Sequence, residues 1–165
     1  MRKIKIEKIT LNIGCGDDKD KIEKANKLLQ VLTGKKPVVT KSKRRSTFGV
    51  PKGKPLGAMV TLRKKEAEEF LKKAIEGVEK KLKASCFDST GNFNFGIREY
   101  IDIPGVKYSH DVGMMGFDVA VTLERGGFRI KKRKIQQKLI GKKHKISIEE
   151  AKEWAKSSLG VEIIE

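Results

Sequence analysis

The sequence predicts an α+β fold, a two-layer sandwich in which helices pack on one face of a mainly antiparallel sheet and leave the other face open. Two kinds of periodicity predict it. Residues 117–124 alternate apolar and polar side chains, as a half-buried strand does, whereas residues 22–32 repeat apolar side chains at helical spacing. The expected order β-α-β-β-α-β-β-β-α groups strands in short runs, which favours antiparallel pairing.

The chain begins with an expected strand and an expected helix. In residues 2–13 apolar side chains alternate, but the phase changes along the strand, which predicts a bulge or bend near Glu7. Asp17 and Asp18 can cap the helix that follows, and Gly34 ends it. The apolar residues at helical spacing are Ile22, Ala25, Leu28, Leu29 and Leu32.

A long loop separates the next two expected strands. Residues 38–42 form the second strand, and residues 43–57, rich in Gly, Pro, Lys and Arg, form a mobile, positively charged loop. The third strand, residues 58–63, alternates apolar and polar side chains. A second amphipathic helix is then expected over residues 65–83, with Phe70, Leu71, Ala74, Val78 and Leu82 on its buried face.

Residues 84–116 are irregular and rich in glycine, with a short strand expected at 100–103. The alternation over 117–124 is the clearest strand signal in the chain. Gly126 and Gly127 then suggest a hairpin turn that leads into a strand at 128–132.

One domain is expected, with an appended C-terminal segment. Residues 1–140 would form an RNA-binding domain with the long basic loop 43–57. Residues 141–165 would form an extension whose short helix packs on the same domain. Ser147 and Glu150 predict a capping box at the start of that helix.

The charge is unevenly distributed. The chain has 38 Lys and Arg against 21 Asp and Glu, a formal net charge of +17. Residues 24–65 contain 13 basic residues and no acid, and residues 125–148 contain 10 more, again with no acid. The other 99 residues carry 15 basic and 21 acidic groups. Two acid-free segments on an otherwise slightly acidic protein indicate a polyanion bound at a defined place.

Several classes of function are excluded or disfavoured. No apolar run approaches the roughly 18 residues of a membrane span, and the N-terminus lacks the pattern of a signal peptide. Cys15 and Cys86 are too few for a disulfide framework or a zinc site. No catalytic constellation is visible, so we expect no enzyme activity, metal or cofactor. His144, in a basic run, fits a phosphate contact better than acid–base chemistry.

The polar face of the expected sheet, beside two basic segments, is typical of a platform for RNA. Phe93 and Phe95 could stack on bases or pack in the core, and their alternation fits both. Two rival functions are a free-standing RNA chaperone or mRNA regulator with the same fold, and an RNA-modifying enzyme.

Five blocks, in order, carry a resemblance to a known family. They are KITLNIGCG, LTGKKPVVTKSKRR, FGVPKGKPLGAMVTLR, FDSTGNFNFGIREYIDIPGV and MMGFDVAVTLERGGFRIKKRK. Together they span nearly the whole chain, which resembles the ribosomal protein L-five family of the large subunit, whose members bind 5S rRNA. The short N-terminus and the segment from GKKHKIS to Trp154 resemble the archaeal and eukaryotic form.

The resemblance implies a cytoplasmic structural constituent of the large ribosomal subunit. Such a protein attaches 5S rRNA to the subunit in the central protuberance and is a monomer outside the ribosome. The residues expected to bind 5S rRNA are Asn12, Lys35, Lys36, Thr40, Ser42, Lys43, Arg44, Arg45, Thr61, Arg63, Ser89 and Asn92.

The resemblance also implies three further contacts. The loop expected to reach P-site tRNA comprises Ser46, Thr47, Phe48, Gly49, Val50, Pro51, Lys52, Gly53 and Lys54, and it departs from many relatives at Val50-Pro51-Lys52. The expected contact with small-subunit protein thirteen, at an intersubunit bridge, involves Tyr108, Ser109, His110, Asp111, Met114 and Met115. Additional contacts with large-subunit rRNA are expected at Arg129, Lys131, Lys132, Arg133, Lys134, Lys142, Lys143 and His144.

Overall fold

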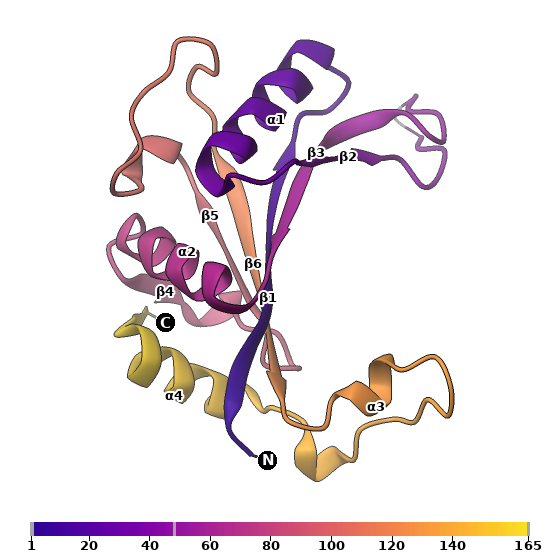
Figure 1. Cartoon of the computed structure of the whole chain (residues 1–165), viewed down its shortest axis with the longest axis vertical. Coiled ribbons are helices and arrows are strands. Elements are labelled where there is room, and N and C mark those ends of the chain that lie inside the picture. Colours follow the sequence, from indigo (N-terminus) through magenta and orange to yellow (C-terminus); the bar gives the residue numbers. More distant parts are fainter. Residues whose placement is uncertain (1, 48, 165) are drawn as a thin grey trace.

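A five-stranded antiparallel sheet runs the length of the molecule, with strand order β2-β3-β1-β6-β5 (Figure 1). The computed structural model describes residues 2–47 and 49–164. Its elements are β1 (Ile4–Gly14), α1 (Lys19–Thr33), β2 (Val38–Lys41), β3 (Pro55–Leu62), α2 (Lys64–Glu76), β4 (Lys81–Lys83), β5 (Phe93–Ile97), β6 (Phe117–Arg125), α3 (Arg129–Lys132), α4 (Ile148–Leu159) and β7 (Glu162–Ile164). Short 3₁₀ turns occur at Ala84–Cys86, Tyr100–Asp102 and Lys142–His144.

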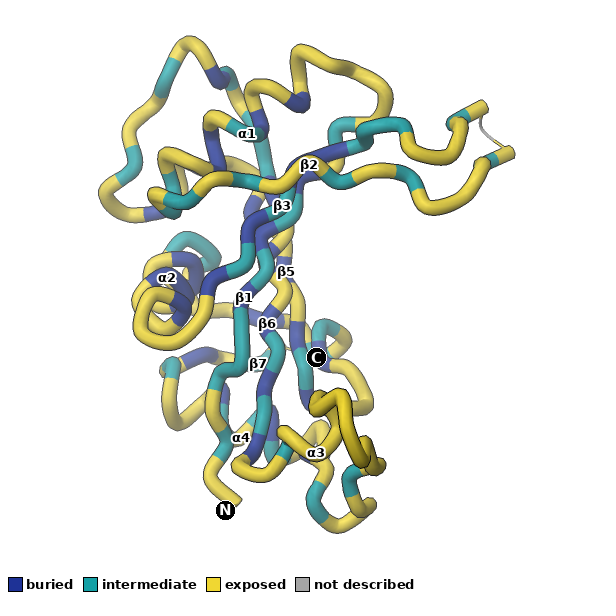
Figure 2. Tube along the Cα trace, turned by 45° about the vertical axis from the view of Figure 1, so that its right-hand side comes forward, coloured by how far each residue is buried: buried dark blue, intermediate teal, exposed yellow. Residues whose placement is uncertain are grey.

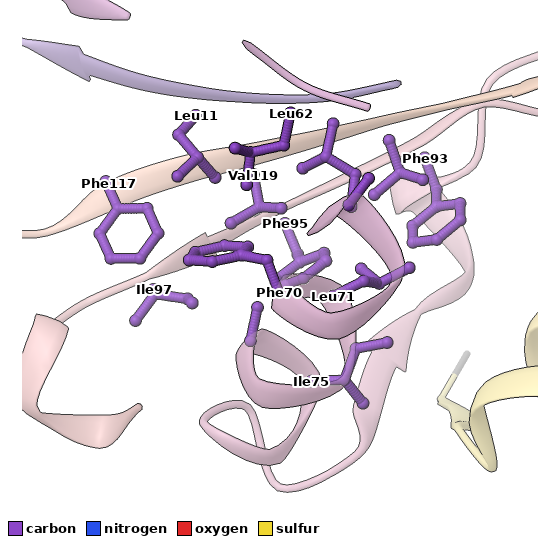
Figure 3. Close-up of a cluster of buried hydrophobic side chains, with 14 of the residues drawn as sticks. Leu11, Leu62, Phe70, Leu71, Ile75, Phe93, Phe95, Ile97, Phe117 and Val119 are labelled. Carbon is purple, nitrogen blue, oxygen red and sulfur yellow. The ribbon is translucent and has the colours of Figure 1, made fainter. Parts of the chain in front are cut away.

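The helices α1 and α2 cover one face of the sheet, and α4 lies beside α2 on the same side (Figures 1 and 2). Alternate side chains of the strands point into this layer, where Phe70, Leu71 and Ile75 of α2 meet Leu11 and Val119 of the sheet (Figure 3). All five are 7% exposed or less, so the apolar face of the strands and the apolar face of the helix are buried against each other. The predicted α+β two-layer fold is confirmed.

The bulge predicted near Glu7 is confirmed. The register between β1 and β6 shifts between Ile6, which lies opposite Leu123, and Lys8, which lies opposite Thr122. One extra residue on β1 brings the apolar residues before and after Glu7 onto the same inward face, although their sequence phases differ. The bulge therefore keeps the whole strand amphipathic with respect to one core.

The predicted helix ends are also confirmed. Asp18 caps α1 by accepting hydrogen bonds from the backbone N–H groups of Asp20 and Lys21, and Gly34 ends the helix with φ 67°. At α4 the Ser147 hydroxyl accepts from the Glu150 N–H while the Glu150 carboxylate accepts from the Ser147 N–H, forming a capping box.

The prediction that the second helix reaches residue 83 was wrong. The helix α2 ends at Glu76, and Lys80 N–H closes a wide turn on the carbonyl of Ile75 at 3.0 Å. Glu79 and Lys80 then have φ values of 54° and 59°, which no helix can accommodate. Leu82 is buried as expected, but from β4, which pairs with β7 in a separate two-stranded parallel sheet.

The strand expected at residues 100–103 was also wrong. That segment forms a 3₁₀ turn, and the strand at this edge of the sheet is β5, paired with β6. Phe93 and Phe95 point inward and are 2% and 7% exposed, so the alternative of base stacking is replaced by core packing.

The hairpin predicted after Gly127 does not form. Residues 129–132 are helical, as α3. The backbone N–H groups of Phe128, Ile130 and Lys131 donate to carbonyls three residues earlier, so they are satisfied within a helical turn and not by the edge of β6 beyond Val121. The chain therefore leaves the sheet at this point.

Candidate nucleic-acid interface

The open face of the sheet carries rows of small polar side chains. Antiparallel register places Thr10 of β1 opposite Thr61 of β3 on one side and opposite Ala120 of β6 on the other, and Asn94 of β5 continues the row. Asn12 lies in the next row. Because α1 and α2 pack on the opposite face, no helix covers this row (Figure 2), in which Thr10, Asn12 and Thr61 are half-buried and Asn94 is exposed.

Two basic segments project beyond this face at opposite ends of the sheet. We call residues 42–54 the hairpin tip and residues 126–145 the basic arm. Figures 1 and 2 show both on the side of the molecule away from α1 and α2, with the open face between them. The two acid-free stretches of the sequence therefore lie on either side of one polar surface, which is a geometry that suits an extended polyanion.

The described residues at the inner part of the hairpin tip continue the hydrogen bonding of β2 and β3. Ser42 N–H donates to the Lys54 carbonyl at 2.8 Å, and Gly53 N–H donates back to the Ser42 carbonyl at 2.9 Å. Nearer the end, Ser46 N–H donates to Val50 O at 3.0 Å. Lys54 also forms an ion pair with Asp17. The exposed cations of the tip are Lys43, Arg44, Arg45 and Lys52. Their neighbours in the tip include Thr47, Gly49 and Pro51, while Phe48 lies outside the described residues.

Four other expected 5S rRNA ligands lie outside the hairpin tip. Thr40 lies opposite Gly57 at the base of the hairpin. Lys35 and Arg63 line one hollow, where Lys35 pairs with Glu66, and Arg63 lies 3.9 Å from Glu7. Lys36 is exposed. Thr40 and the expected ligands of the tip are thus brought together at the hairpin end of the sheet, whereas Arg63 lies nearer its other end, beside Glu7.

Ser89 and Asn92 are not brought to that end. They lie in the turn before β5, where Asn92 Oδ1 accepts from Leu123 N–H at 3.2 Å and Asn92 Nδ2 donates to Thr90 Oγ1 at 2.8 Å. Ser89 Oγ donates to Asp88 at 3.2 Å. These hydrogen bonds shape the turn, so the two side chains are already engaged within the protein.

Lys132 of the basic arm forms ion pairs within the protein. Lys132 Nζ lies 2.6 Å from Glu7 Oε1 and 2.7 Å from Glu124 Oε2. Partial burial by itself would lower the pKa of Lys132, but its hydrogen bonds to the two carboxylates outweigh burial, so the pKa is raised. The other expected cations, Arg129, Lys131, Arg133, Lys134, Lys142 and Lys143, are exposed.

His144 closes the base of the basic arm. Its Nε2 lies 2.9 Å from the Gly126 carbonyl oxygen, and its ring meets Phe128 edge-on, with ring centroids 5.8 Å apart. Through these contacts His144 joins the two ends of the arm. The ring is therefore held within the protein, and its expected phosphate contact stays a prediction.

Sequence reasoning missed Arg125, which anchors the arm from inside the fold. It is 5% exposed, its Nη2 lies 2.6 Å from Glu150, and its Nη1 donates to the Lys145 carbonyl at 3.4 Å. The signal was present in the sequence, because Arg125 continues the inward phase of residues 117–123. Hydrogen bonds from the Ser147 backbone and from Arg125 hold the pKa of Glu150 below its ordinary value.

The segment expected at an intersubunit contact forms a loop at the hairpin end of the molecule, on the other side of α1 (Figure 1). Ser109 N–H donates to the buried Tyr100 hydroxyl at 2.9 Å, which holds the loop to the core. Tyr108 packs its ring against His110 at 5.3 Å and is 48% exposed, and Met114 is 57% exposed. Asp111 is exposed, and Met115 packs against the core.

The described residues contain no group of three or more His, Cys, Asp or Glu side chains arranged to hold a metal. Cys15 and Cys86 are both half-buried free thiols, and burial, with a further contribution from the Asp18 carboxylate, raises the pKa of Cys15. The described helices are too short or too polar to span a bilayer.

Comparison with known proteins shows a consistent relationship over the whole chain. Family models described as Ribosomal protein L5 and as the C-terminus of the same ribosomal family match residues 1–50 and 55–151. Large ribosomal subunit protein uL5 of Sulfurisphaera tokodaii is 49% identical, over 100% of this chain and 94% of the relative. The uL5 proteins of Nanoarchaeum equitans and Methanosphaera stadtmanae are 48% and 43% identical, each over 99% of this chain and 98% of the relative.

These matches agree with the structure, in which an open polar sheet face lies between two basic segments. Identity of 43–49% across nearly the full length of three relatives leaves no segment of the fold unaccounted for. The chain therefore belongs to the ribosomal protein L5 family and is a structural constituent of the large ribosomal subunit, not an enzyme.

Proposed function

We propose that this protein binds 5S rRNA on the open face of its sheet and helps attach that RNA to the large subunit in the central protuberance. One observation carries the proposal: a row of Thr and Asn side chains crosses the open face between two acid-free basic segments. A surface that only kept the protein soluble would not concentrate its cations at the two ends of one polar face.

The chemistry of the face suits RNA. Thr10, Thr61 and Asn12 carry hydroxyl and amide groups that can exchange hydrogen bonds with 2′-OH groups and base edges. The cross-strand neighbours of Thr10 are small, Thr61 and Ala120, so the sugar edge of an RNA can approach the sheet closely there, whereas Asn12 lies between Met59 and Asp118. Lys43, Arg44 and Arg45, at the inner part of the hairpin tip, neutralise phosphates beside this contact, which contributes affinity without reading sequence, and leave residues 46–54 for another partner.

The remaining surfaces are assigned to other ribosomal partners. The hairpin tip projects from the base of the platform and contacts P-site tRNA, for which exposed Lys52 provides a point charge that can follow a moving phosphate. The loop that presents Tyr108 and Met114 contacts small-subunit protein thirteen. The exposed cations of the basic arm contact large-subunit rRNA. Residues 141–165 act as an extension of the RNA-binding domain of residues 1–140.

A titration with 5S rRNA tests the proposal. The purified protein should bind 5S rRNA more tightly than a structured control RNA of the same length at the same salt concentration. Chemical footprinting of the complex should protect one contiguous region of the 5S rRNA. Equal affinity for both RNAs, with no localised protection, would contradict a specific 5S rRNA site and leave only general attraction to polyanions.

A further inference from the structure

Two carboxylates lie where the proposed RNA site should exclude them. Glu7, at the bulge of β1, and Glu124, near the end of β6, belong to the arm end of the open face. Their side chains are only 15% and 33% exposed. Negative charge beside bound phosphate is unfavourable. The two carboxylates must therefore either weaken RNA binding or serve a purpose within the protein.

The ammonium group of Lys132 bridges the two carboxylates. It lies 2.6 Å from Glu7 and 2.7 Å from Glu124, while Arg63 approaches Glu7 from β3 at 3.9 Å. An ammonium group shared by two carboxylates, one of them largely buried, has better geometry than the isolated exposed ion pairs that contribute almost nothing. This cluster fastens α3 to the sheet.

The outer part of the basic arm is held mainly by contacts within itself. Arg133 Nε donates to the Gln136 carbonyl at 2.9 Å, and Lys138 N–H donates to Ile130 O at 3.3 Å. Residues 129–139 are all exposed. Within the described part of the chain, Lys132 is the side chain of α3 that forms ion pairs with the sheet. Arg125 and His144 hold the base of the arm, and this cluster therefore contributes the ion pairs that fix how α3 lies against the sheet.

We propose that Glu7, Glu124 and Lys132 are positioning residues that lock the basic arm against the sheet before RNA binds. The inference rests on the proposed RNA-binding function and adds a specific role for this cluster. A locked arm presents Arg129, Lys131 and Lys134 as a preformed wall of the RNA site, so less conformational entropy is lost on binding. Lys132 then acts on the arm and not on phosphate.

If the cluster locks the arm, removing its carboxylates should change RNA affinity in the direction opposite to that expected from net charge alone. Replacing both carboxylates with Gln adds two units of positive charge to the protein, which by itself strengthens RNA binding. If the carboxylates position the arm, Glu7→Gln with Glu124→Gln should instead weaken 5S rRNA binding by about threefold to tenfold. Glu68→Gln with Glu69→Gln, on exposed positions of α2, is the matched control and should leave binding unchanged or slightly stronger.

Hydrogen exchange of the free protein tests the lock without RNA. In Glu7→Gln/Glu124→Gln, amides of residues 129–138 should exchange faster than in the wild type, while those of α1 stay unchanged. Should the double variant fold poorly, Lys132→Gln provides the same test, with Lys131→Gln as its neighbouring control. Lys132→Arg should preserve slow exchange, because Arg can still bridge the two carboxylates.

The outcomes separate the two proposals. Faster exchange in the arm together with weaker RNA binding supports the positioning role. Faster exchange with RNA binding equal to or tighter than that of the Glu68/Glu69 control would overturn that role, since the arm would be freed without consequence. Unchanged exchange would show that the cluster does not hold the arm. Failure of the wild-type protein to prefer 5S rRNA would instead reject the proposed function, whatever the exchange data show.

Discussion

At the scale of single residues, Gly57 controls how closely the hairpin base approaches β1. A Cβ atom at this position would lie 2.1 Å from the Ile13 carbonyl oxygen and 3.2 Å from Thr40 Oγ1. The first distance is far inside van der Waals contact with backbone that cannot rotate away. The absence of a side chain therefore permits the pairing that carries Thr40 and the hairpin tip.

Gly57→Ala should destabilise the protein by about 3 kcal/mol, because the added methyl group forces β3 away from β1. Urea denaturation followed by circular dichroism measures the change. Gly96→Ala is the matched control in β5, since its nearest neighbour would be Asp118 Oδ1 at 3.4 Å, an ordinary contact. Equal stability of the two variants would show that the β1–β3 approach is not limited by this glycine.

Asn12 and Thr61 are expected to act on RNA and not on folding, because both side chains lie on the open face. Changing both to Ala should weaken 5S rRNA binding by about 1 kcal/mol per lost hydrogen bond, or more if an RNA group is left buried and unpaired. The circular dichroism spectrum should stay that of the wild type. A correctly folded double variant that binds 5S rRNA normally would remove the sheet face from the site.

The pairing of Glu150 with Arg125 predicts a pH dependence of stability. The Ser147 backbone hydrogen bond and Arg125 lower the pKa of Glu150 from its ordinary 4.5. A lowered pKa in the folded state contributes stability that is present above the ordinary pKa and is lost as pH falls through the lowered value. Because the Glu150 side chain is 44% exposed, the contribution should be on the order of 1 kcal/mol.

Glu150→Gln should therefore be less stable than the wild type at neutral pH, and the difference should shrink as pH falls below about 4.5. Urea midpoints of both proteins, measured between neutral and acidic pH, provide the comparison. A constant difference across that range would mean that the charge of Glu150 does not contribute.

At the scale of elements, the hairpin tip separates into a paired base and an outer turn. Ser42 exchanges hydrogen bonds with Gly53 and Lys54, so these residues belong structurally to the β2–β3 ladder. Of the residues beyond that ladder, the described ones, 47 and 49–52, do not belong to the buried core. The base and the outer turn can therefore be changed independently.

Replacing residues 47–52 with a Gly-Ser linker should leave thermal stability and 5S rRNA affinity nearly unchanged, because the ladder and the sheet face are retained. Occupancy of the ribosomal P site by tRNA should fall, because Lys52 and its neighbours are lost. Two titrations on one variant measure both effects. Loss of 5S rRNA binding with unchanged tRNA occupancy would instead place the turn in the 5S rRNA site.

At the scale of the whole molecule, charge is divided between two ends of one face, so 5S rRNA affinity should depend steeply on salt. If about six phosphates are neutralised, a plot of log affinity against log salt should have a slope of roughly −4 to −5. Lys43→Gln/Arg44→Gln/Arg45→Gln should make that slope shallower, whereas Lys72→Gln/Lys73→Gln on α2 should not. A wild-type slope shallower than about −2 would mean that the basic segments are not the RNA surface.

Much of the local structure was predictable from sequence because it depends on near neighbours. Asp18, Gly34 and the Ser147–Glu150 pair determine helix ends through hydrogen bonds and backbone conformation within a few residues. Alternation identified β1, β3 and β6, although it missed β5, and the bulge near Glu7 followed from a change of phase. The fold class followed from these local signals, whereas the residues expected to bind 5S rRNA were implied by the family resemblance.

The sequence by itself determined the fold class, the helix caps and the presence of two basic segments. Only the tertiary structure decided the strand order and showed that the chain leaves the sheet after β6 to form a helix at residues 129–132. It also brought Lys132 to Glu7, more than a hundred residues away in the chain. Such contacts depend on which distant segments of the chain pair in space. The local periodicity of a sequence does not reveal the free energy of that pairing.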